Sequence, residues 1–300
     1  MSLRQAPAAP TLAVALAVAL GATLDAVIKH LGGSIHPVMI AFGRFAFGTL
    51  VAIGFYLATS ARRIHWDQAR FHAGRGLVIV VSATTFFYAL SVMPLVEAIT
   101  IGFLAPLIVP GMAWILLRER PPATSLPAAL LGFVGVIIAI AGAPVDDAAY
   151  PDRLWGALAA FVAVIAYALQ LTLLRMRAGI DGPAITTLFA NLFPALYLAI
   201  PALLVAPIPP LETAPLFLVL GFLGAGLWTL MAWAYARAPA AALAPLEYSA
   251  LIWSAALGFA FFDEVPRLQT IIGGIVIAGA CLWLAWDEQR RARLAAAAAS

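Results

Sequence analysis

The sequence predicts an all-α integral membrane protein: ten transmembrane helices forming two inverted five-helix repeats, with both termini in the cytoplasm. Three observations lead to this fold class. Hydrophobic residues make up 64% of the 300 positions and charged residues 10%, whereas soluble domains carry about 25% charged residues. Apolar runs of about 20 residues, the length that spans a bilayer, recur along the whole chain. Basic residues gather at alternate ends of those runs.

The predicted spans are separated by short breaks that contain proline, glycine or charge. They lie near residues 11–31, 37–59, 75–93, 95–117, 124–142, 154–175, 183–206, 214–236, 239–262 and 268–286. The first run also looks like a signal peptide, with one basic residue before an apolar stretch. Its apolar character continues past Ala26 and nine similar runs follow, so we interpret it as a spanning helix.

The basic residues predict the orientation of the chain. With the N-terminus in the cytoplasm, thirteen of the 17 Lys and Arg residues fall inside, including Arg75 at the edge of the third run, and three fall outside. This positive-inside excess predicts a multi-pass protein of the cytoplasmic (inner) membrane. The net charge of +3 does not indicate nucleic-acid binding, because these residues lie in short loops and not in one basic patch. A single cysteine, Cys281, excludes an intramolecular disulfide.

An internal repeat emerges when the chain is shifted by about 145 residues against itself. Pro37 then meets Pro183, Pro94 meets Pro239, and the E-x-P of residues 119–121 meets that of 264–266. Because each half holds five spans, the second half must enter the membrane from the opposite side. The predicted halves are residues 1–146 and 147–287, followed by a cytoplasmic tail at 288–300.

The motifs of both halves resemble the EamA-type branch of the drug/metabolite transporter superfamily. They are LDAVIKHL (24–31), FGRF (42–45), YALSVMPLVEA (88–98), LLRERP (116–121), LGFVGVIIAIAG (131–142), AYARAPAAALAPLEY (234–248), FFDEVP (261–266) and IIGGIVIAGA (271–280). The resemblance implies a ten-helix fold, a central substrate cavity and alternating access. Members of that branch move amino acids, nucleosides, amines, S-adenosylmethionine and other metabolites. The D-x-x-x-K … R pattern of the first two spans looks most like the subgroup with S-adenosylmethionine and amino-acid carriers.

Ionisable residues inside the spans mark the candidate site. At a rise of about 1.5 Å per residue, five polar groups share a layer near the predicted outer surface. They are Asp25, Lys29, Arg44, Tyr88 and Glu97. An arginine at bilayer depth needs a partner, and we name Asp25 first and Glu97 second. Two interpretations stay open: a clasp that holds two helices together, or a charged binding site or outer gate.

The repeat predicts a matching inner layer that contains Gln170, Asn191 and Glu247. Glu247 has no basic residue in its run, so it is either a proton carrier or counter-ion for a cationic substrate, or a neutral acid that bonds a neighbouring helix. Aromatic residues at mid-span are candidates for the cavity wall: Phe103, Tyr167, Trp228 and Tyr248. Pro106 and Pro110 lie within one span and are hinge candidates.

These features predict a secondary transporter or exchanger of a small polar or amphipathic metabolite, such as an amino acid, an amine or an S-adenosylmethionine-like molecule. Its expected partners are that substrate, a proton or counter-substrate, and the lipid bilayer; we expect no nucleic acid, cofactor or metal. The alternatives are a membrane enzyme acting on lipid and a small-solute channel. The sequence lacks H-E-x-x-H and G-x-S-x-G motifs, and its four histidines do not cluster, which argues against the enzyme.

Overall fold

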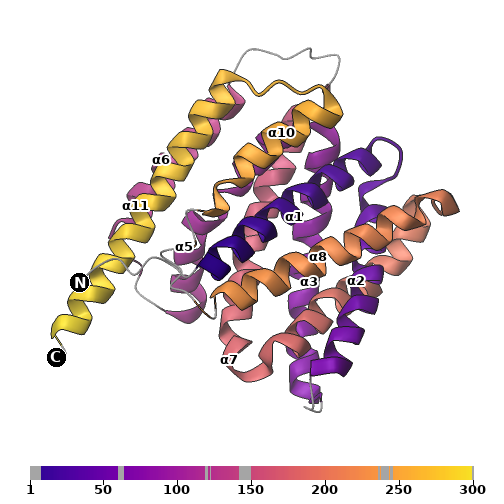
Figure 1. The fold of residues 1–300 in the computed structure, drawn as a ribbon, viewed down its shortest axis with the longest axis horizontal. Helices are drawn as coiled ribbons and strands as arrows, with labels where there is room; N and C mark the ends of the chain where they lie inside the picture. Colours follow the sequence, from indigo (N-terminus) through magenta and orange to yellow (C-terminus); the bar gives the residue numbers. More distant parts are fainter. Residues whose placement is uncertain are drawn as a thin grey trace.

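The computed structural model describes residues 8–59, 64–118, 121, 123–141, 150–235, 237, 243 and 246–298. Helices account for nearly all of these residues, and no strand occurs among them. Figure 1 shows the helices as one bundle, with α6 and α11 side by side along one edge. The predicted all-α fold is therefore confirmed.

The described residues of the first half form six helices. They are α1 (Ala8–Gly32), α2 (Pro37–Thr59), α3 (Trp66–Val92), α4 (Leu95–Gly102), α5 (Ala105–Leu117) and α6 (Ser125–Ile140). α4 and α5 together form the predicted fourth span, interrupted by a turn at residues 103–104. Pro106 lies in the first turn of α5 and Pro110 inside it, so the predicted hinge residues directly follow a break in the helix.

The second half begins with a long helical segment, α7 (Arg153–Val205), which changes direction at Gly182. Gly182 has φ 74° and ψ 163°, a backbone conformation that is essentially restricted to glycine. Among the described residues, α7 is followed by η1 (Leu211–Thr213), α8 (Ala214–Tyr235), α10 (Ala250–Phe262) and α11 (Leu268–Ala298). α11 runs through most of the predicted tail at 288–300 as continuous helix.

Eight helical segments of the described chain are long and apolar enough to cross a membrane. Two further apolar helices, α6 and α10, are shorter. One predicted boundary is wrong: α3 begins at Trp66, not near residue 75. The Gln68 side chain accepts a hydrogen bond from the His65 backbone N–H (2.9 Å), and such a cap stabilises an early helix start. Arg75 therefore lies inside a helix and not at the edge of a loop.

Two structural details recur at the spacing of the sequence repeat. The turn at residues 103–104 has a counterpart at 248–249, and α10 starts and ends 145 residues after α5. Arg118 and Asp263, which directly follow these helices, have positive φ of 56° and 54°. Glu119, Pro239 and the predicted boundary at residue 146 lie outside the described residues.

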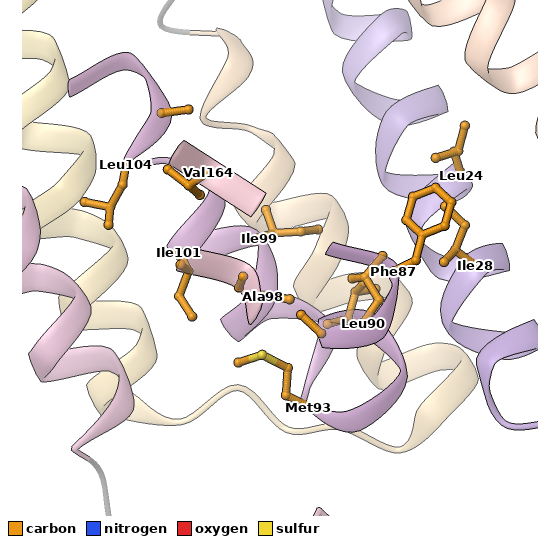
Figure 2. Packing of buried hydrophobic residues seen from close by; sticks show 14 of the residues in the cluster. Leu24, Ile28, Phe87, Leu90, Met93, Ala98, Ile99, Ile101, Leu104 and Val164 are labelled. Carbon is orange, nitrogen blue, oxygen red and sulfur yellow. The ribbon is translucent and has the colours of Figure 1, made fainter. Parts of the chain in front are cut away.

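The interior is apolar and closely packed, whereas the periphery exposes large apolar side chains. Phe87 of α3 lies against Leu24 and Ile28 of α1, within the main buried cluster (Figure 2). At the α6–α11 contact, a Cβ on Gly273 would come within 2.4 Å of the Gly135 carbonyl oxygen, so glycine permits this close approach. Exposed residues such as Leu57 and Leu204 (74% and 80%) suit a surface surrounded by lipid.

Candidate functional site

A cavity of about 590 Å³ lies between α1, α2, α3, α7 and α8. Its wall is mainly apolar and aromatic, with Phe86 and Trp228 among its members. Three charged side chains also line it, Asp25 from α1, Arg44 from α2 and Arg75 from α3. A mainly apolar cavity of a few hundred Å³ with a few convergent polar groups is the usual form of a small-molecule site.

Arg44 is held inside the bundle by aromatic and backbone surroundings. Its guanidinium carbon lies 4.4 Å from the centre of the Phe45 ring, a cation–π contact. A Cβ on Gly224 of α8 would lie 3.2 Å from Arg44 Nη2. The glycine therefore makes room for the guanidinium at the cavity wall.

Asp25 and Arg44 share the cavity and their charges interact, as predicted. Within the described part of the chain, however, no salt bridge joins them, which does not support the first of the two interpretations, a clasp between the two helices. The second predicted partner of Arg44 is wrong, because Glu97 pairs with Arg153 at 2.8 Å. Both cavity charges therefore have capacity for a ligand.

Four more predicted residues line the same cavity: Tyr167, Gln170, Asn191 and Trp228. Gln170 accepts a hydrogen bond from Arg75 Nη2 (3.2 Å). Asn191 donates to the Thr187 carbonyl (2.9 Å). Polar groups from α7 thus face charged groups from α1, α2 and α3 across the cavity.

Lys29 and Glu97 lie in a buried ionic group beyond one end of the cavity. We call it the Lys29 cluster: Lys29, Glu97, Tyr150, Arg153 and Glu264. Lys29 pairs with Glu264 (2.9 Å) and donates to the Met93 carbonyl (2.7 Å). Glu264 also accepts hydrogen bonds from the Leu95 backbone N–H (2.8 Å) and the Tyr150 hydroxyl. Burial, together with the hydrogen bond to Glu264, raises the pKa of Tyr150 well above its usual value, so the hydroxyl stays protonated and donates.

A second polar group lies beyond the other end of the cavity. We call it the Asp181 cluster: Gln68, His72, Arg177 and Asp181. Asp181 accepts hydrogen bonds from Gln68 (2.9 Å), His72 (3.0 Å) and Arg177 (3.1 Å). Burial acts to raise the pKa of Asp181, but these three hydrogen bonds outweigh it and hold the pKa below its usual value. Asp181 is therefore ionised at neutral pH and ties α3 to the bend of α7.

Positions along α3 order the two clusters and the cavity. Lys29 donates to the Leu90 carbonyl (3.3 Å), and His72 lies 18 residues earlier, about 27 Å along the helix axis. The cavity residues of α3, from Arg75 to Phe87, fall between these positions. The cavity therefore lies between two polar clusters at opposite ends of the bundle.

The remaining predicted residues lie outside the cavity lining. The rings of Phe103 and Tyr248 lie next to each other, with their centres 5.1 Å apart and their planes tilted by 38°. The charge of Glu247 interacts with Tyr167, which also interacts with Asp25. Tyr88 is absent from both clusters. Of the predicted layer of five outer polar groups, two line the cavity and two belong to the Lys29 cluster, whereas Tyr88 belongs to neither.

Sequence reasoning missed several members of the site. The sequence analysis used Arg75 and Arg153 only as topology signals, and it used the four histidines only as an argument against a membrane enzyme. Asp181 carried one usable signal, because it is the lone acid in a basic segment, RMRAGID. Glu264 was visible as the acid of the repeated E-x-P motif, but its pairing with Lys29, 235 positions earlier, depends on the tertiary structure.

Apolar helices around an internal charged cavity define a multi-pass membrane protein of the small-molecule transporter class. Residues 9–141 and 154–286 each match the EamA-like transporter family, so the chain belongs to this family. The resemblance drawn from the sequence motifs is confirmed, and the family identifies a transporter and not an enzyme.

Several proteins are similar to this chain over most of its length. An "S-adenosylmethionine uptake transporter" of Rickettsia bellii (strain RML369-C) is 28% identical and covers 89% of both chains. A "Riboflavin transporter" of Rhizobium johnstonii is 25% identical over 84% of this chain and 82% of the relative. A crystal structure with a TM-score of 0.63 and 23% identity covers 94% of this chain and 98% of that one; this similarity concerns the fold alone.

Proposed function

We propose that the chain is a secondary transporter or exchanger, in the cytoplasmic (inner) membrane, of a metabolite that carries both a carboxylate and a cationic group. The single observation that carries this proposal is the charge pattern of the cavity wall. Asp25 offers a site for an ammonium or sulfonium group, and guanidinium groups offer sites for a carboxylate. An apolar wall strengthens both interactions, because it lowers the local dielectric.

S-adenosylmethionine is the first substrate to test. It carries a carboxylate, an ammonium, a sulfonium and an aromatic base, and a relative that is 28% identical bears the name of its uptake transporter. The aromatic side chains Phe86, Tyr167 and Trp228 of the wall offer stacking surfaces for the base. A riboflavin transporter among the relatives is consistent with a site for an aromatic ring.

We further propose ten spans in two inverted repeats, residues 1–146 and 147–287, with both termini and the tail at 288–300 in the cytoplasm. Support comes from the 145-residue spacing that the two family matches share with α5 and α10. The excess of basic residues on one predicted side supports the orientation. Reactivity of a single cysteine placed at Ser300 or Thr213 toward a membrane-impermeant reagent tests it: only Thr213→Cys should react from outside.

Transport by alternating access is the mechanism we propose. The Lys29 cluster and the Asp181 cluster lie beyond opposite ends of the cavity and are the two candidate gates. The break before Pro106 and the kink at Gly182 are positions where helices can change angle. A proton or a counter-substrate would couple the cycle, and Glu247, whose charge interacts with Tyr167, is the candidate proton carrier.

Uptake by proteoliposomes tests the substrate and the class together. Purified protein is reconstituted and exposed to radiolabelled S-adenosylmethionine, with unlabelled compound inside or outside. We expect saturable uptake that internal substrate accelerates, and a loss of about tenfold or more with Asp25→Asn, since a charged hydrogen-bond acceptor is removed. Glu212→Gln, at an exposed acid on η1, is the matched control.

The alternatives predict other results. Uptake that does not saturate, with conductance far above carrier turnover, would identify a channel. Saturable uptake of other metabolites but not of S-adenosylmethionine would reject this substrate and keep the transporter. Unchanged uptake in Asp25→Asn would show that the Asp25 carboxylate does not bind the substrate.

A further inference from the structure

Arg75 is a buried cation without an acidic partner of its own. Arg75 is only 5% exposed, and its side chain lines the cavity. Within the described residues it forms no salt bridge; its guanidinium contacts only neutral groups, His72 (3.3 Å) and Gln170 (3.2 Å). Its Nε is buried and has no hydrogen-bond partner. A buried guanidinium without a carboxylate partner lowers the stability of the folded protein, unless a ligand supplies the missing negative charge.

The contact with His72 fixes the state of the imidazole. Arginine can only donate hydrogen bonds, so Nδ1 of His72 must be the acceptor of the Arg75 contact. The ring proton is then on Nε2 and is donated to Asp181. His72 is therefore neutral in this arrangement, and it connects Arg75 to Asp181 without neutralising the guanidinium directly.

The nearest acidic residues interact with groups other than Arg75. Asp181 accepts from three other side chains, and the charge of Asp25 acts on Arg44. Arg44 also has the Phe45 ring beneath it. Of the two guanidinium groups in the cavity, Arg75 is the one that has a buried donor without a partner and no interacting carboxylate.

We propose that Arg75 is the carboxylate-binding residue of the cavity and that Gln170 and His72 position it. This inference rests on the proposed function, in that a small metabolite occupies the cavity. The two present contacts, at 3.2 and 3.3 Å, are longer than the 2.7–2.9 Å typical of charge-assisted hydrogen bonds. A carboxylate that displaces Gln170 gains Nη2 and the unused Nε, which together form a bidentate fork.

This site makes the cavity selective for the carboxylate of its ligand. The substrate would extend from Arg75, near the Asp181 cluster, toward Asp25, one helical turn from Lys29. Its cationic group would then meet Asp25, and its aromatic part would lie between them. An analogue without the carboxylate would leave the Arg75 guanidinium buried and unpaired, which is the basis for discrimination.

A probe smaller than the natural substrate tests Arg75 independently of transport. Benzoate and benzamide have nearly the same shape, but only benzoate is an anion. The thermal unfolding of the purified full-length protein is measured against the concentration of each, since binding to the folded state raises its apparent stability. We expect benzoate to stabilise the wild-type protein at concentrations where benzamide has no effect.

Four variants locate the anion site. Arg75→Gln should weaken benzoate binding by about tenfold to a hundredfold, because charged hydrogen bonds are lost. Arg75→Lys should retain partial binding, since the charge remains but the fork is lost. Arg44→Gln should keep the preference for benzoate over benzamide. Arg70→Gln, at an exposed position of the same helix, is the control and should behave like the wild type.

The inference is overturned if benzoate and benzamide act alike on the wild-type protein, or if Arg44→Gln removes the preference and Arg75→Gln retains it. If Arg75→Gln does not fold, the preference for benzoate over benzamide is measured in Arg75→Lys and Gln170→Ala by the same thermal unfolding experiment. Loss of the preference in Arg75→Gln together with failure of S-adenosylmethionine uptake in the wild type would reject the proposed substrate and keep the subsite.

Discussion

The two polar clusters of the bundle differ in how their buried charges are neutralised. In the Lys29 cluster each cation has a carboxylate at salt-bridge distance, Lys29 with Glu264 and Arg153 with Glu97. In the Asp181 cluster one carboxylate serves three donors, and the neighbouring Arg75 has only neutral partners.

This difference indicates which of the two candidate gates is harder to open and which can adjust to a ligand. A paired and enclosed ion pair is costly to break, because separation leaves two uncompensated charges. Long hydrogen bonds to neutral groups are exchanged at little cost for a better acceptor. The Lys29 cluster thus acts as a clasp, and the region from Asp181 to Arg75 can respond to a ligand.

The largest effect is expected from Glu264→Gln. The change preserves the size of the side chain but leaves the buried ammonium of Lys29 unpaired, so stability should fall by about 3–5 kcal/mol. Denaturant unfolding in detergent measures this, with exposed Glu212→Gln as the control. The double variant Lys29→Met/Glu264→Gln should be less destabilised than Glu264→Gln alone, and the reverse order would contradict the clasp.

Asp181→Asn should have a smaller effect, about 2 kcal/mol, through its hydrogen bonds to charged or polar donors. Because the folded-state pKa of Asp181 is lowered, its contribution is complete above about pH 5 and disappears as the pH falls through the lowered pKa. The wild type should therefore lose stability below about pH 4 more steeply than Asp181→Asn. Parallel acid unfolding curves for the two proteins would show that Asp181 does not contribute in this way.

Tyr150→Phe should cost about 1.5 kcal/mol, since the hydroxyl donates to the Glu264 carboxylate and the ring is otherwise preserved. The same denaturant measurement applies. In the Glu264→Gln background the additional loss should shrink, because the charged acceptor is already gone. Full additivity of the two changes would argue against a shared cluster.

The smallest effect is expected from Asp67→Asn. The Asp67 side chain is 69% exposed and pairs with Arg177 at 2.8 Å, and such surface pairs are screened by solvent. We expect no measurable change in thermal stability, although the same residue type at Asp181 matters. A loss comparable to that of Asp181→Asn would mean that the cluster extends to the surface.

The membrane class, most of the helical segments and the family could be predicted from the amino-acid sequence. These depend on properties that local composition records: the length of apolar runs, the breaks between them, and motifs spaced 145 residues apart. The sequence also identified Asp25, Arg44, Tyr167, Gln170, Asn191 and Trp228, all of which line the cavity, because polar or aromatic side chains inside apolar runs are conspicuous.

The pairing of the buried charges could not be predicted from the sequence and is seen only in the folded protein. Lys29 and Glu264 are 235 positions apart, and His72 and Asp181 are 109 apart, so no local pattern links them. Arg75 was predicted to lie at the edge of a loop, but α3 begins nine residues earlier, at Trp66, so Arg75 lies in the cavity wall. Ion pairs act over a few ångströms in space, and in a bundle of helices that proximity is set by packing and not by distance along the chain.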